Sequence, residues 1–357
     1  MPNRSKPFAP LTILGLMSGT SLDGLDLALC DFWKDDNGFH YNIIKTQTFP
    51  YDENLSQKLR NLFTGSALYF CEVEVEFSNF TAQCVNQFLE NEKKKPHYVA
   101  SHGHTVFHQP EKGLTKQIGS GAILAAKTRI STICDFRTTD VALGGQGAPL
   151  VPIGDALLFS KYDACLNLGG ISNISKHINN ETTAHDISLC NIPLNYLAEQ
   201  LGFHYDKNGE LAKKGNINFD LLMDFNTNDY FINNNAKTLG FEFFANYFQP
   251  LLDSFNIVVE DKLRTVCEHI ALQIAHNIND LQTVLVTGGG AKNKFLIELI
   301  KEKTETQLII PDEQIIDFKE AMIFAFLGYL RVHKEHNCLQ SVTDAVKNSC
   351  GGGIFTC

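Results

Sequence analysis

Two segments, one near the start of each half of the chain, have a strand–turn–strand pattern whose turn is rich in glycine and hydroxyl side chains. The first passes from the apolar residues 11–17 through "SGTSLDG" (18–24) into residues 25–32, and the second is "ACLNLGGISNISKH" (164–177). Apolar runs on both sides of a short polar turn predict a β-hairpin. Such a tip can bind phosphate through main-chain N–H groups and hydroxyls, while a nearby carboxylate organises a metal ion. For one loop alone an ordinary polar turn is the favoured explanation, so the prediction of phosphate binding depends on the repetition of the pattern.

A third glycine-rich turn lies later in the chain, in "TVLVTGGGAKNKFLIELI", which begins at Thr283 and predicts strand, turn and helix. Asn293 stands where the dinucleotide fingerprint G-x-G-x-x-G requires its last glycine, so a nicotinamide-binding Rossmann site fits poorly. Glycines 288–290 would still let an adenosine approach the main chain beside a helix N-terminus. A tight strand-to-helix turn without a ligand explains this element equally well.

The remaining pattern mixes strands and helices. Strands are predicted at 40–50, 97–101 and 130–134, and helices within 53–92, at 119–129 and at 321–330. The glycine-rich stretch "DFRTTDVALGGQGAPLVP" (135–152) carries few signals of either kind, and an ordered loop of this length is usually functional. We therefore expect an α/β protein with an N-terminal lobe over 1–150 and a C-terminal lobe over 151–357, whose tail can pack back on the first lobe.

Charge, cysteine spacing and hydrophobicity argue against several classes of protein. The 357 residues carry a formal net charge of −10 with no compensating basic stripe, which argues against nucleic acid as a partner. None of the ten cysteines forms a C-x-x-C pair, so we expect reduced thiols rather than disulfides or zinc ligands. The apolar run at 11–14 is too short for a signal peptide, and 321–330 is about half a membrane span. These features predict a cytoplasmic protein without a membrane partner.

Two phosphate hairpins followed by an adenosine-type turn resemble the acetate and sugar kinase, Hsp70 and actin superfamily. Within it, the chain resembles the anhydro-N-acetylmuramic acid kinase family through eight motifs in the family's order. These are "GLMSGTSLDGLDLAL" (15–29), "SHGHTVFHQP" (101–110), "TKQIG" (115–119), "DFRTTDVALGGQGAPLVP" (135–152), "LNLGGISN" (166–173), "HDISLCN" (185–191), "VTGGGAKN" (286–293) and "KEAMIFAFLG" (319–328). The resemblance implies a two-lobed actin-like ATPase fold, in which each lobe is a mixed sheet flanked by helices and the nucleotide lies in the interlobe cleft.

The resemblance also implies a reaction. In 1,6-anhydro-N-acetylmuramic acid, O6 is bonded to C1, so the kinase must break this bond while it delivers phosphate. Water attacks C1, O6 departs and takes the γ-phosphoryl group of ATP, giving N-acetylmuramate 6-phosphate and ADP in the recycling of peptidoglycan amino sugars. The implied cofactors are ATP and Mg²⁺, and the implied assembly is a homodimer.

The family's functional residues map onto matching positions of this chain. Asp186 is the implied general base, in a polar turn before a helix that we expect Asn191 to cap, although a turn or capping role is the alternative for Asp186. Arg137 can pair with the sugar's lactyl carboxylate, and His102 and Glu320 are further implied substrate contacts. Local packing or hydrogen bonding is the alternative for His102, and a surface ion pair with Lys319 is the alternative for Glu320. The implied nucleotide-binding residues are Gly19, Thr20, Ser21, Leu22, Asp23, Gly24, Leu25, Asp26, Gly169, Gly170, Ser172, Asn173, Gly288, Gly289 and Gly290. Asp23 and Asp26 are the candidates for organising Mg²⁺ through water, although Asp26 is equally well an Asx-turn residue.

Two positions depart from the family pattern. His104 stands where the family commonly has glutamine, and Ser188-Leu189 stands where it commonly has Gly-Pro, which puts the backbone beside Asp186 in question. Two other functions remain open at this point. One is a conventional sugar or acetate kinase with a free acceptor group, and the other is an Hsp70-like or actin-like nucleotide switch. The switch is disfavoured because no lid, peptide-binding domain or polymer-contact insertion accompanies the nucleotide core.

Overall fold

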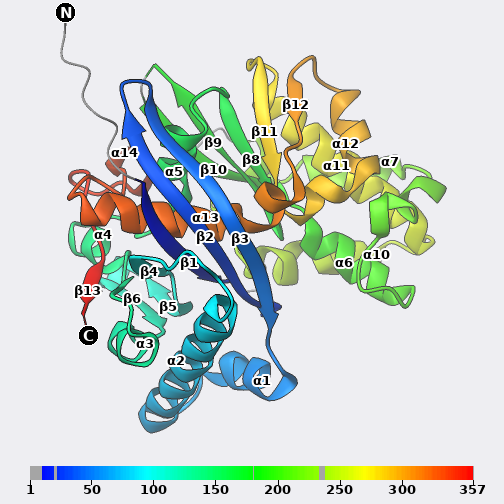
Figure 1. Ribbon diagram of the computed structural model, residues 1–357. Helices are drawn as coiled ribbons and strands as arrows, with labels where there is room; N and C mark the ends of the chain where they lie inside the picture. The colour runs from blue at the N-terminus through cyan, green and yellow to red at the C-terminus, as the bar shows by residue number, and fades with distance from the viewer. Residues whose placement is uncertain (1–9, 20–21, 180, 233–237, 357) are drawn as a thin grey trace, which may run out of the picture. The chain divides into compact units, whose positions relative to one another are not determined.

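The computed structural model describes residues 10–19, 22–179, 181–232 and 238–356 (Figure 1). The contacts divide the chain into two compact units, one of Met1–Phe159 with Phe318–Cys357 and the other of Ser160–Asp317. The expected boundary at residue 150 therefore falls just before α5 (Val151–Leu158), which packs against β3 of the first unit. The second boundary falls within helix α13 (Glu313–Val332).

Unit 1 contains a six-stranded mixed sheet in the order β13-β7-β4-β1-β2-β3. Its strands are β1 (Leu11–Ser18), β2 (Gly24–Asp35), β3 (Gly38–Pro50), β4 (Tyr98–Ser101), β7 (Thr132–Cys134) and β13 (Gly353–Phe355). The predicted hairpin forms between β1 and β2, which pair antiparallel from Leu11↔Phe32 to Ser18↔Leu25. β1 pairs parallel with β4 on its other side. Because both faces of this central strand are covered, it is apolar along nearly its whole length.

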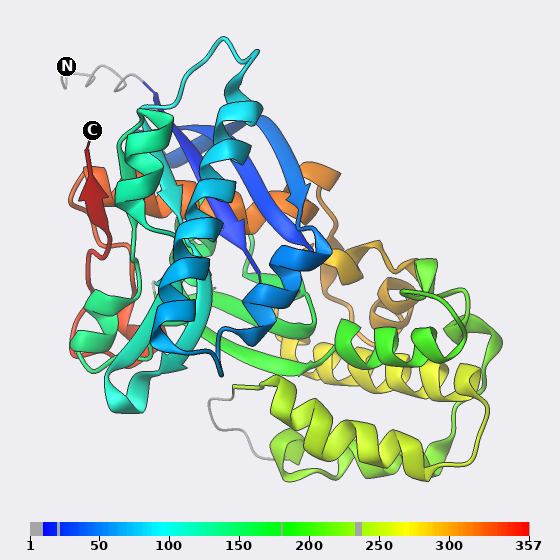
Figure 2. The same ribbon diagram turned by 90° about the horizontal axis from the view of Figure 1, so that it is seen from below.

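The other elements of unit 1 are helices and a separate two-stranded sheet formed by β5 and β6. They are α1 (Glu53–Asn61), α2 (Ala67–Leu89), β5 (His104–Gln109), η1 (Pro110–Lys112), β6 (Leu114–Ile118), α3 (Gly121–Thr128), α4 (Thr138–Ala142), α5, the larger part of α13, and α14 (Gln340–Thr343). Figure 2 shows β13, in dark red, beside α3. The β5–β6 hairpin, α4 and β13 were not predicted, and the long loop at 135–152 contains α4 and the start of α5.

A close approach between α13 and the sheet depends on glycine. A Cβ atom on Gly15 would collide with the main-chain oxygen of Ala321, and one on Gly328 would lie 2.7 Å from the Cβ of Ala100. The helix and the sheet can therefore pack at this distance only because both side chains are absent. This contact holds the start of the apolar stretch 321–330 against the central strand of unit 1.

Unit 2 repeats the strand arrangement of unit 1. Its five-stranded sheet has the order β10-β9-β8-β11-β12, with two antiparallel pairings followed by two parallel ones, as in β3-β2-β1-β4-β7. The strands are β8 (Ala164–Leu168), β9 (Ile171–Ile178), β10 (Glu181–Leu189), β11 (Thr283–Thr287) and β12 (Gln307–Ile309). The predicted α/β class, with a mixed sheet flanked by helices in each half, is confirmed.

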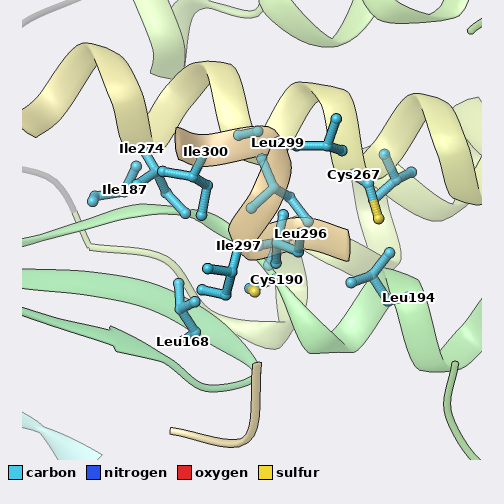
Figure 3. Packing of buried hydrophobic residues seen from close by; sticks show 14 of the residues in the cluster. Leu168, Ile187, Cys190, Leu194, Cys267, Ile274, Leu296, Ile297, Leu299 and Ile300 are labelled. Carbon is cyan, nitrogen blue, oxygen red and sulfur yellow. The ribbon is translucent and has the colours of Figure 1, made fainter. Parts of the chain in front are cut away.

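Helices of unit 2 cover one apolar face of this sheet. They are α6 (Asn191–Gln200), η2 (Lys207–Gly209), η3 (Ala212–Lys214), α7 (Phe219–Asn226), α8 (Asp229–Ile232), α9 (Phe241–Phe243), η4 (Phe244–Phe248), α10 (Gln249–Ser254), α11 (Val259–Ile278), η5 (Gly289–Lys292) and α12 (Lys294–Lys301). In Figure 3, Leu296 and Ile300 of α12 and Ile274 of α11 gather with Leu168 and Ile187 of the sheet. This cluster anchors the strand ends that carry the unit's glycine turns.

The described cysteines are free thiols. Burial raises the pKa of Cys190 to about 12, so this thiol behaves as a small apolar side chain within the core of unit 2. Within the described part of the chain, no helix combines the length and the apolar character that crossing a membrane requires.

Candidate active site

The loop of the first hairpin joins the buried end of β1 to the start of β2. Thr20 and Ser21 lie outside the described residues. Leu22 has a positive φ of 59°, and its N–H donates to the carbonyl of Gly19 over 3.5 Å. A Cβ atom on Gly24 would lie 2.5 Å from the main-chain oxygen of Phe49, so the loop can enter β2 here only with glycine.

A short chain of hydrogen bonds holds the base of this loop. The Tyr51 hydroxyl donates to Ser18 Oγ at 2.7 Å, and Ser18 Oγ lies 3.0 Å from His104 Nδ1. Burial lowers the pKa of His104 to about 4, so the ring is neutral near pH 7 and can accept from the serine. His104, which departs from the family pattern, therefore has a structural contact next to the loop.

The two predicted metal-organising carboxylates have different surroundings. Asp23 is exposed within the loop. Asp26 lies in β2 opposite Thr48 of β3, whose hydroxyl donates to Asp26 Oδ1 at 2.5 Å. The predicted Asx-turn alternative for Asp26 does not hold, because the residue lies within a strand.

Arg137 and His102 form the centre of a polar cluster in unit 1. Arg137 donates from Nε (3.2 Å) and from Nη2 (2.9 Å) to His102 Nε2, and from Nη1 (2.8 Å) to the carbonyl of Gly147. Since Nε2 accepts, the proton of the neutral ring is on Nδ1, which donates to the carbonyl of Gly103 at 2.9 Å. Burial, followed by the charge of Arg137, holds the pKa of His102 well below its usual range.

This arrangement leaves donors on Arg137 for a ligand. A guanidinium has five N–H groups, and contacts within the described residues use three of them. Burial lowers the pKa of Arg137 to about 10, so the group stays charged at neutral pH. Arg137 can therefore still bind a carboxylate while His102 and Gly147 hold it in place.

Glu320 of α13 belongs to the same cluster. Burial raises its pKa, Lys319 and Arg137 act in the opposite direction, and Asp26 and Asp155 raise the pKa further. The alternative of a surface ion pair with Lys319 is wrong. Lys319 is buried and its ammonium lies 3.0 Å from Asp155 Oδ1, on α5.

A cavity of about 380 Å³ in unit 1 has His102 in its wall. Its other lining residues are Glu74, Thr115, Lys116, Gln117, Ile118, Gly119, Ser120, Gly121, Cys134, Asp135, Thr138, Gly353 and Phe355. His102 follows β4 and Arg137 follows β7, which are parallel neighbours, so both residues lie at the carboxyl edge of the sheet. Ligands of open α/β sheets commonly bind at this edge.

The two glycine turns of unit 2 lie at the equivalent edge. Gly169 and Gly170 follow β8, and the turn that begins at Gly288 follows its parallel neighbour β11, with Asn167 opposite Thr287. Gly288 has a positive φ of 81°, and a Cβ atom there would lie 2.5 Å from Asn167 Oδ1. The close approach of the two turns therefore requires glycine at this position.

The start of α6 braces the first of these turns. The N–H groups of Cys190 and Asn191 donate to the carbonyls of Gly170 and Gly169 at 2.9 and 3.1 Å. Asn191 is the first residue of α6 rather than its cap, and its side-chain Nδ2 donates to the carbonyl of Leu168 at 3.0 Å. The predicted capping role of Asn191 is therefore wrong, because its amide binds the turn.

Ser172 and Asn173, in β9, have unlike environments. Ser172 is fully buried, and its Oγ donates to the carbonyl of Ser188 at 3.0 Å. Its hydroxyl is thus engaged within the sheet. Asn173 pairs in register with Asn167 of β8 and with Asp186 of β10. Directly opposite residues of antiparallel strands point to the same face, so these three polar side chains are neighbours.

Asp186 lies within strand β10, and not in the turn that the sequence predicted. The strand is irregular at this point, because its register shifts between Asp186 and Ser188. The N–H of Leu239 donates to Asp186 Oδ2 at 2.8 Å, and no described residue donates to Oδ1. Burial raises the pKa of Asp186 to about 6, against the lowering effect of the Leu239 N–H. The result is an oriented carboxylate whose Oδ1 accepts no hydrogen bond from the part of the chain that the structure describes, and whose basicity is increased.

A family model for anhydro-N-acetylmuramic acid kinase matches residues 11–357. The chain belongs to the anhydro-N-acetylmuramic acid kinase family. The family member from Sulfurimonas denitrificans is 32% identical, over 96% of this chain and 98% of that protein. The member from Haemophilus influenzae is 36% identical, over 97% of this chain and 98% of that protein. The resemblance seen in the sequence is confirmed, and the protein is an enzyme, a kinase.

Among solved structures, the activator of the 2-hydroxyisocaproyl-CoA dehydratase from Clostridium difficile with bound ADPNP covers 91% of this chain and 97% of its own. The sequence identity is 12% and the TM-score is 0.43, which is too low to support an inference.

Three residues beside the predicted site of this family member were missed by sequence reasoning. Asn167 lies between the two glycine turns, and Tyr230 and Leu239 contact Asp186. Asn167 lies in the family motif 166–173, and a polar side chain in an otherwise apolar strand could have indicated that it belongs to the site. Tyr230 and the main chain of Leu239 have no such signal, because neither belongs to a recognisable motif.

Proposed function

We propose that this family member uses ATP and Mg²⁺ to open the 1,6-anhydro bridge of 1,6-anhydro-N-acetylmuramic acid and to phosphorylate O6. Family membership supports the kinase activity and the sugar substrate. The proposed mechanism rests on Asp186, whose pKa of about 6 suits a general base and whose Oδ1 accepts no hydrogen bond from the described residues. The products are N-acetylmuramate 6-phosphate and ADP.

In the proposed reaction, Oδ1 of Asp186 accepts a proton from the water that attacks C1. The C1–O bond to the water forms, the C1–O6 bond breaks, and O6 takes its electron pair to the γ-phosphorus of ATP. ADP leaves with the electrons of the broken P–O bond. A carboxylate with a pKa of about 6 is mostly ionised at pH 7, yet it accepts a proton more readily than an ordinary aspartate.

The cluster in unit 1 supplies the proposed sugar contacts. The donors that remain on Arg137 would bind the lactyl carboxylate, and His102 would position the guanidinium. Glu320 would contact the sugar as a carboxyl whose pKa is raised by burial. The roles of these residues rest on the resemblance to the family motifs, and their geometry is compatible with them.

The glycine turns are the proposed contacts for the nucleotide. In unit 1 these are residues 19–26, and in unit 2 they are Gly169, Gly170, Asn173 and the turn at 288–290. Asp23 and Asp26 present the oxygen donors that Mg²⁺ prefers, and Asp26 Oδ1 is oriented by Thr48. When bound, Mg²⁺ neutralises phosphate charge during transfer. Ser172 supports the sheet instead, because its hydroxyl binds Ser188.

The assembly and the location of the enzyme are further proposals. The free thiols of the described residues fit a reducing compartment, which supports a cytoplasmic location. The homodimer rests on the family resemblance alone. Size-exclusion chromatography with light scattering tests it, and a monomer mass at micromolar concentration would contradict it.

Mass spectrometry of the reaction in ¹⁸O-labelled water tests the proposed function. With ATP and the anhydro-sugar, a briefly incubated sample should give the sugar phosphate with no heavy oxygen at O6. N-acetylmuramic acid and glucose serve as control acceptors, and ATP without sugar serves as the control for a switch. Preference for a free hydroxyl would indicate a conventional sugar kinase, whereas ADP release without any acceptor would indicate a nucleotide switch.

A further inference from the structure

Two groups that flank residues 233–237 contact Asp186. Tyr230, in α8, donates its hydroxyl to the main-chain carbonyl of Asp186 at 2.8 Å. The N–H of Leu239 donates to Oδ2 of the Asp186 side chain, also at 2.8 Å. One group therefore holds the main chain of Asp186 and the other holds its carboxylate.

Tyr230 is itself held in place by the core of unit 2. Its N–H donates to Asn228 Oδ1 at 2.9 Å, and its ring lies 5.1 Å from Phe231 and 5.5 Å from Phe243. Phe231 packs edge-on against His269 of α11, at 4.7 Å between ring centroids. The hydroxyl thus reaches β10 from a short helix that is fixed by aromatic packing, and this geometry makes it a rigid donor.

The main chain at Asp186 requires such support because of the bulge in β10. The register shift between Asp186 and Ser188 interrupts the regular pairing with β9. A bulge re-aims the neighbouring side chains, and the carbonyl at the interruption needs a donor. The Tyr230 hydroxyl supplies that donor at the residue whose carboxylate faces the proposed reaction.

We propose that Tyr230 is a positioning residue for Asp186, which fixes the main chain so that the Leu239 N–H engages Oδ2 and Oδ1 is left for the reacting water. The proposal rests on the proposed function, in which Asp186 is the general base. It assigns to Tyr230 a part in the reaction that differs from substrate or nucleotide binding.

The hydrogen bond from Tyr230 also influences the pKa of Asp186. The hydrogen bond from the Leu239 N–H lowers the pKa of Asp186, against the larger effect of burial. Without the Tyr230 hydroxyl the main chain is held less firmly, the bond to Oδ2 weakens and the pKa rises. The other titratable neighbour on β10 is His185, whose Nε2 lies 2.8 Å from Asn277 Oδ1 on α11, while β9 places the uncharged Asn173 opposite Asp186.

The substitution Tyr230→Phe tests the proposal, with Tyr247→Phe as the matched control. The Tyr247 hydroxyl also donates to a main-chain carbonyl, that of Asp224, at 2.8 Å in the same unit, and it does not contact Asp186. The measurements are kcat, KM for ATP and KM for the sugar between pH 5 and 9. In Tyr230→Phe, we expect the apparent pKa for the fall of kcat on the acid side of the pH profile to rise by about half a unit or more. KM for ATP should be unchanged.

At pH values below this apparent pKa, the kcat of Tyr230→Phe should therefore be reduced by roughly threefold or more. At pH values well above it, the kcat should approach that of the wild type. Tyr247→Phe should have the same apparent pKa for kcat as the wild type. An equal loss of kcat at every pH, or the same profile in both variants, would overturn the proposal. If either variant is too unstable for kinetics, ¹³C-carboxyl NMR of labelled aspartates reads the pKa of Asp186 directly, and an unchanged pKa overturns it.

The variant Asp186→Asn separates this inference from the proposed function. If Asp186→Asn keeps full activity, the general base is misassigned and the proposed mechanism fails. If Asp186→Asn is inactive and Tyr230→Phe titrates like the wild type, the role of Tyr230 alone is wrong.

Discussion

Arg137 donates to one nitrogen of His102 twice, from Nε at 3.2 Å and from Nη2 at 2.9 Å. The two residues are 35 positions apart and follow parallel strands of unit 1, so the sheet brings them together. Because the histidine is neutral and accepts, it orients the guanidinium without cancelling its charge. His102 therefore leaves the charge of Arg137 intact, and the proposed function assigns that charge to an anionic group of the sugar.

His102→Ala should raise KM for the sugar by about tenfold and leave KM for ATP nearly unchanged. The loss of two charge-assisted hydrogen bonds lets the Arg137 side chain leave its position, at a cost of about 1.5 kcal/mol or more. Steady-state kinetics with each substrate varied in turn gives both constants. His40→Ala is the control, because the Nε2 of His40 lies 2.8 Å from Asp35 Oδ1 and the ring contacts neither Arg137 nor His102 within the described residues. A larger effect on KM for ATP would contradict the assignment of this cluster to the sugar.

Asp186→Asn should reduce ring opening and phosphorylation together, by at least about a hundredfold. The amide keeps the shape of the carboxylate and cannot take the proton from water. Nucleotide binding should survive, because the glycine turns are unchanged. Mass spectrometry follows both products, and calorimetry measures the affinity for ATP. A variant that opened the ring without phosphorylating it would show that the two steps are separate.

The rate of the wild-type enzyme should fall below about pH 6, because only the ionised form of Asp186 accepts a proton. Each further pH unit should cost about a factor of ten in kcat. The residual activity of Asp186→Asn should not show this fall of kcat at acid pH. A fall of kcat only near pH 4 in the wild type would mean that Asp186 has an ordinary aspartate pKa or is not the base.

The same pKa predicts how stability depends on pH. Burial raises the pKa of Asp186 in the folded state above the unfolded value, so the folded protein binds more protons between about pH 4 and pH 6. Stability from this group is therefore fully present below pH 4 and is lost as the pH rises through 6. Asp186→Asn should raise the Tm by a few degrees at pH 7.5 and have little effect at pH 4. Thermal unfolding followed by circular dichroism at the two pH values gives the comparison, and an equal change at both would contradict the raised pKa.

Gly19→Val should weaken ATP binding by roughly tenfold or more, because a branched side chain would stand where the loop must approach phosphate. Calorimetry with and without Mg²⁺ measures the affinity, which should also fall when the metal is removed. Gly353→Val is the matched control, since a Cβ atom there would meet its nearest neighbour at 3.6 Å and has room. Unchanged affinity in Gly19→Val would place the phosphate elsewhere.

Lys319→Met should destabilise unit 1 by about 3 kcal/mol, because it removes the ion-pair partner of the buried Asp155. The double variant Lys319→Met/Asp155→Leu should recover part of this loss, since it also removes the buried Asp155 carboxylate that the Lys319 ammonium contacts. Urea unfolding measures the three proteins. If the single and double variants lost the same stability, the ion pair would not explain the effect.

Local signals in the sequence were sufficient for the hairpins of both halves. Apolar runs next to glycine-rich turns form β1–β2 and β8–β9, and a strand followed by three glycines forms β11 and the turn before α12. These elements need only neighbours along the chain, so their pattern is visible without the fold. The family motifs added the class of enzyme and named Asp186, Arg137 and Glu320 as candidates.

Tertiary contacts decided the environments of those candidates. Asp186 lies in a strand because β9 pairs with a segment that is too polar to predict one, and its carbonyl binds Tyr230 at a separation of 44 residues. Lys319 pairs with Asp155 across 164 residues of sequence. Hydrogen bonds and burial between distant segments set these pairings and the raised pKa of Asp186. Burial and hydrogen bonding between distant segments depend on which segments pack together. The local propensity of a sequence for helix or strand does not determine that packing.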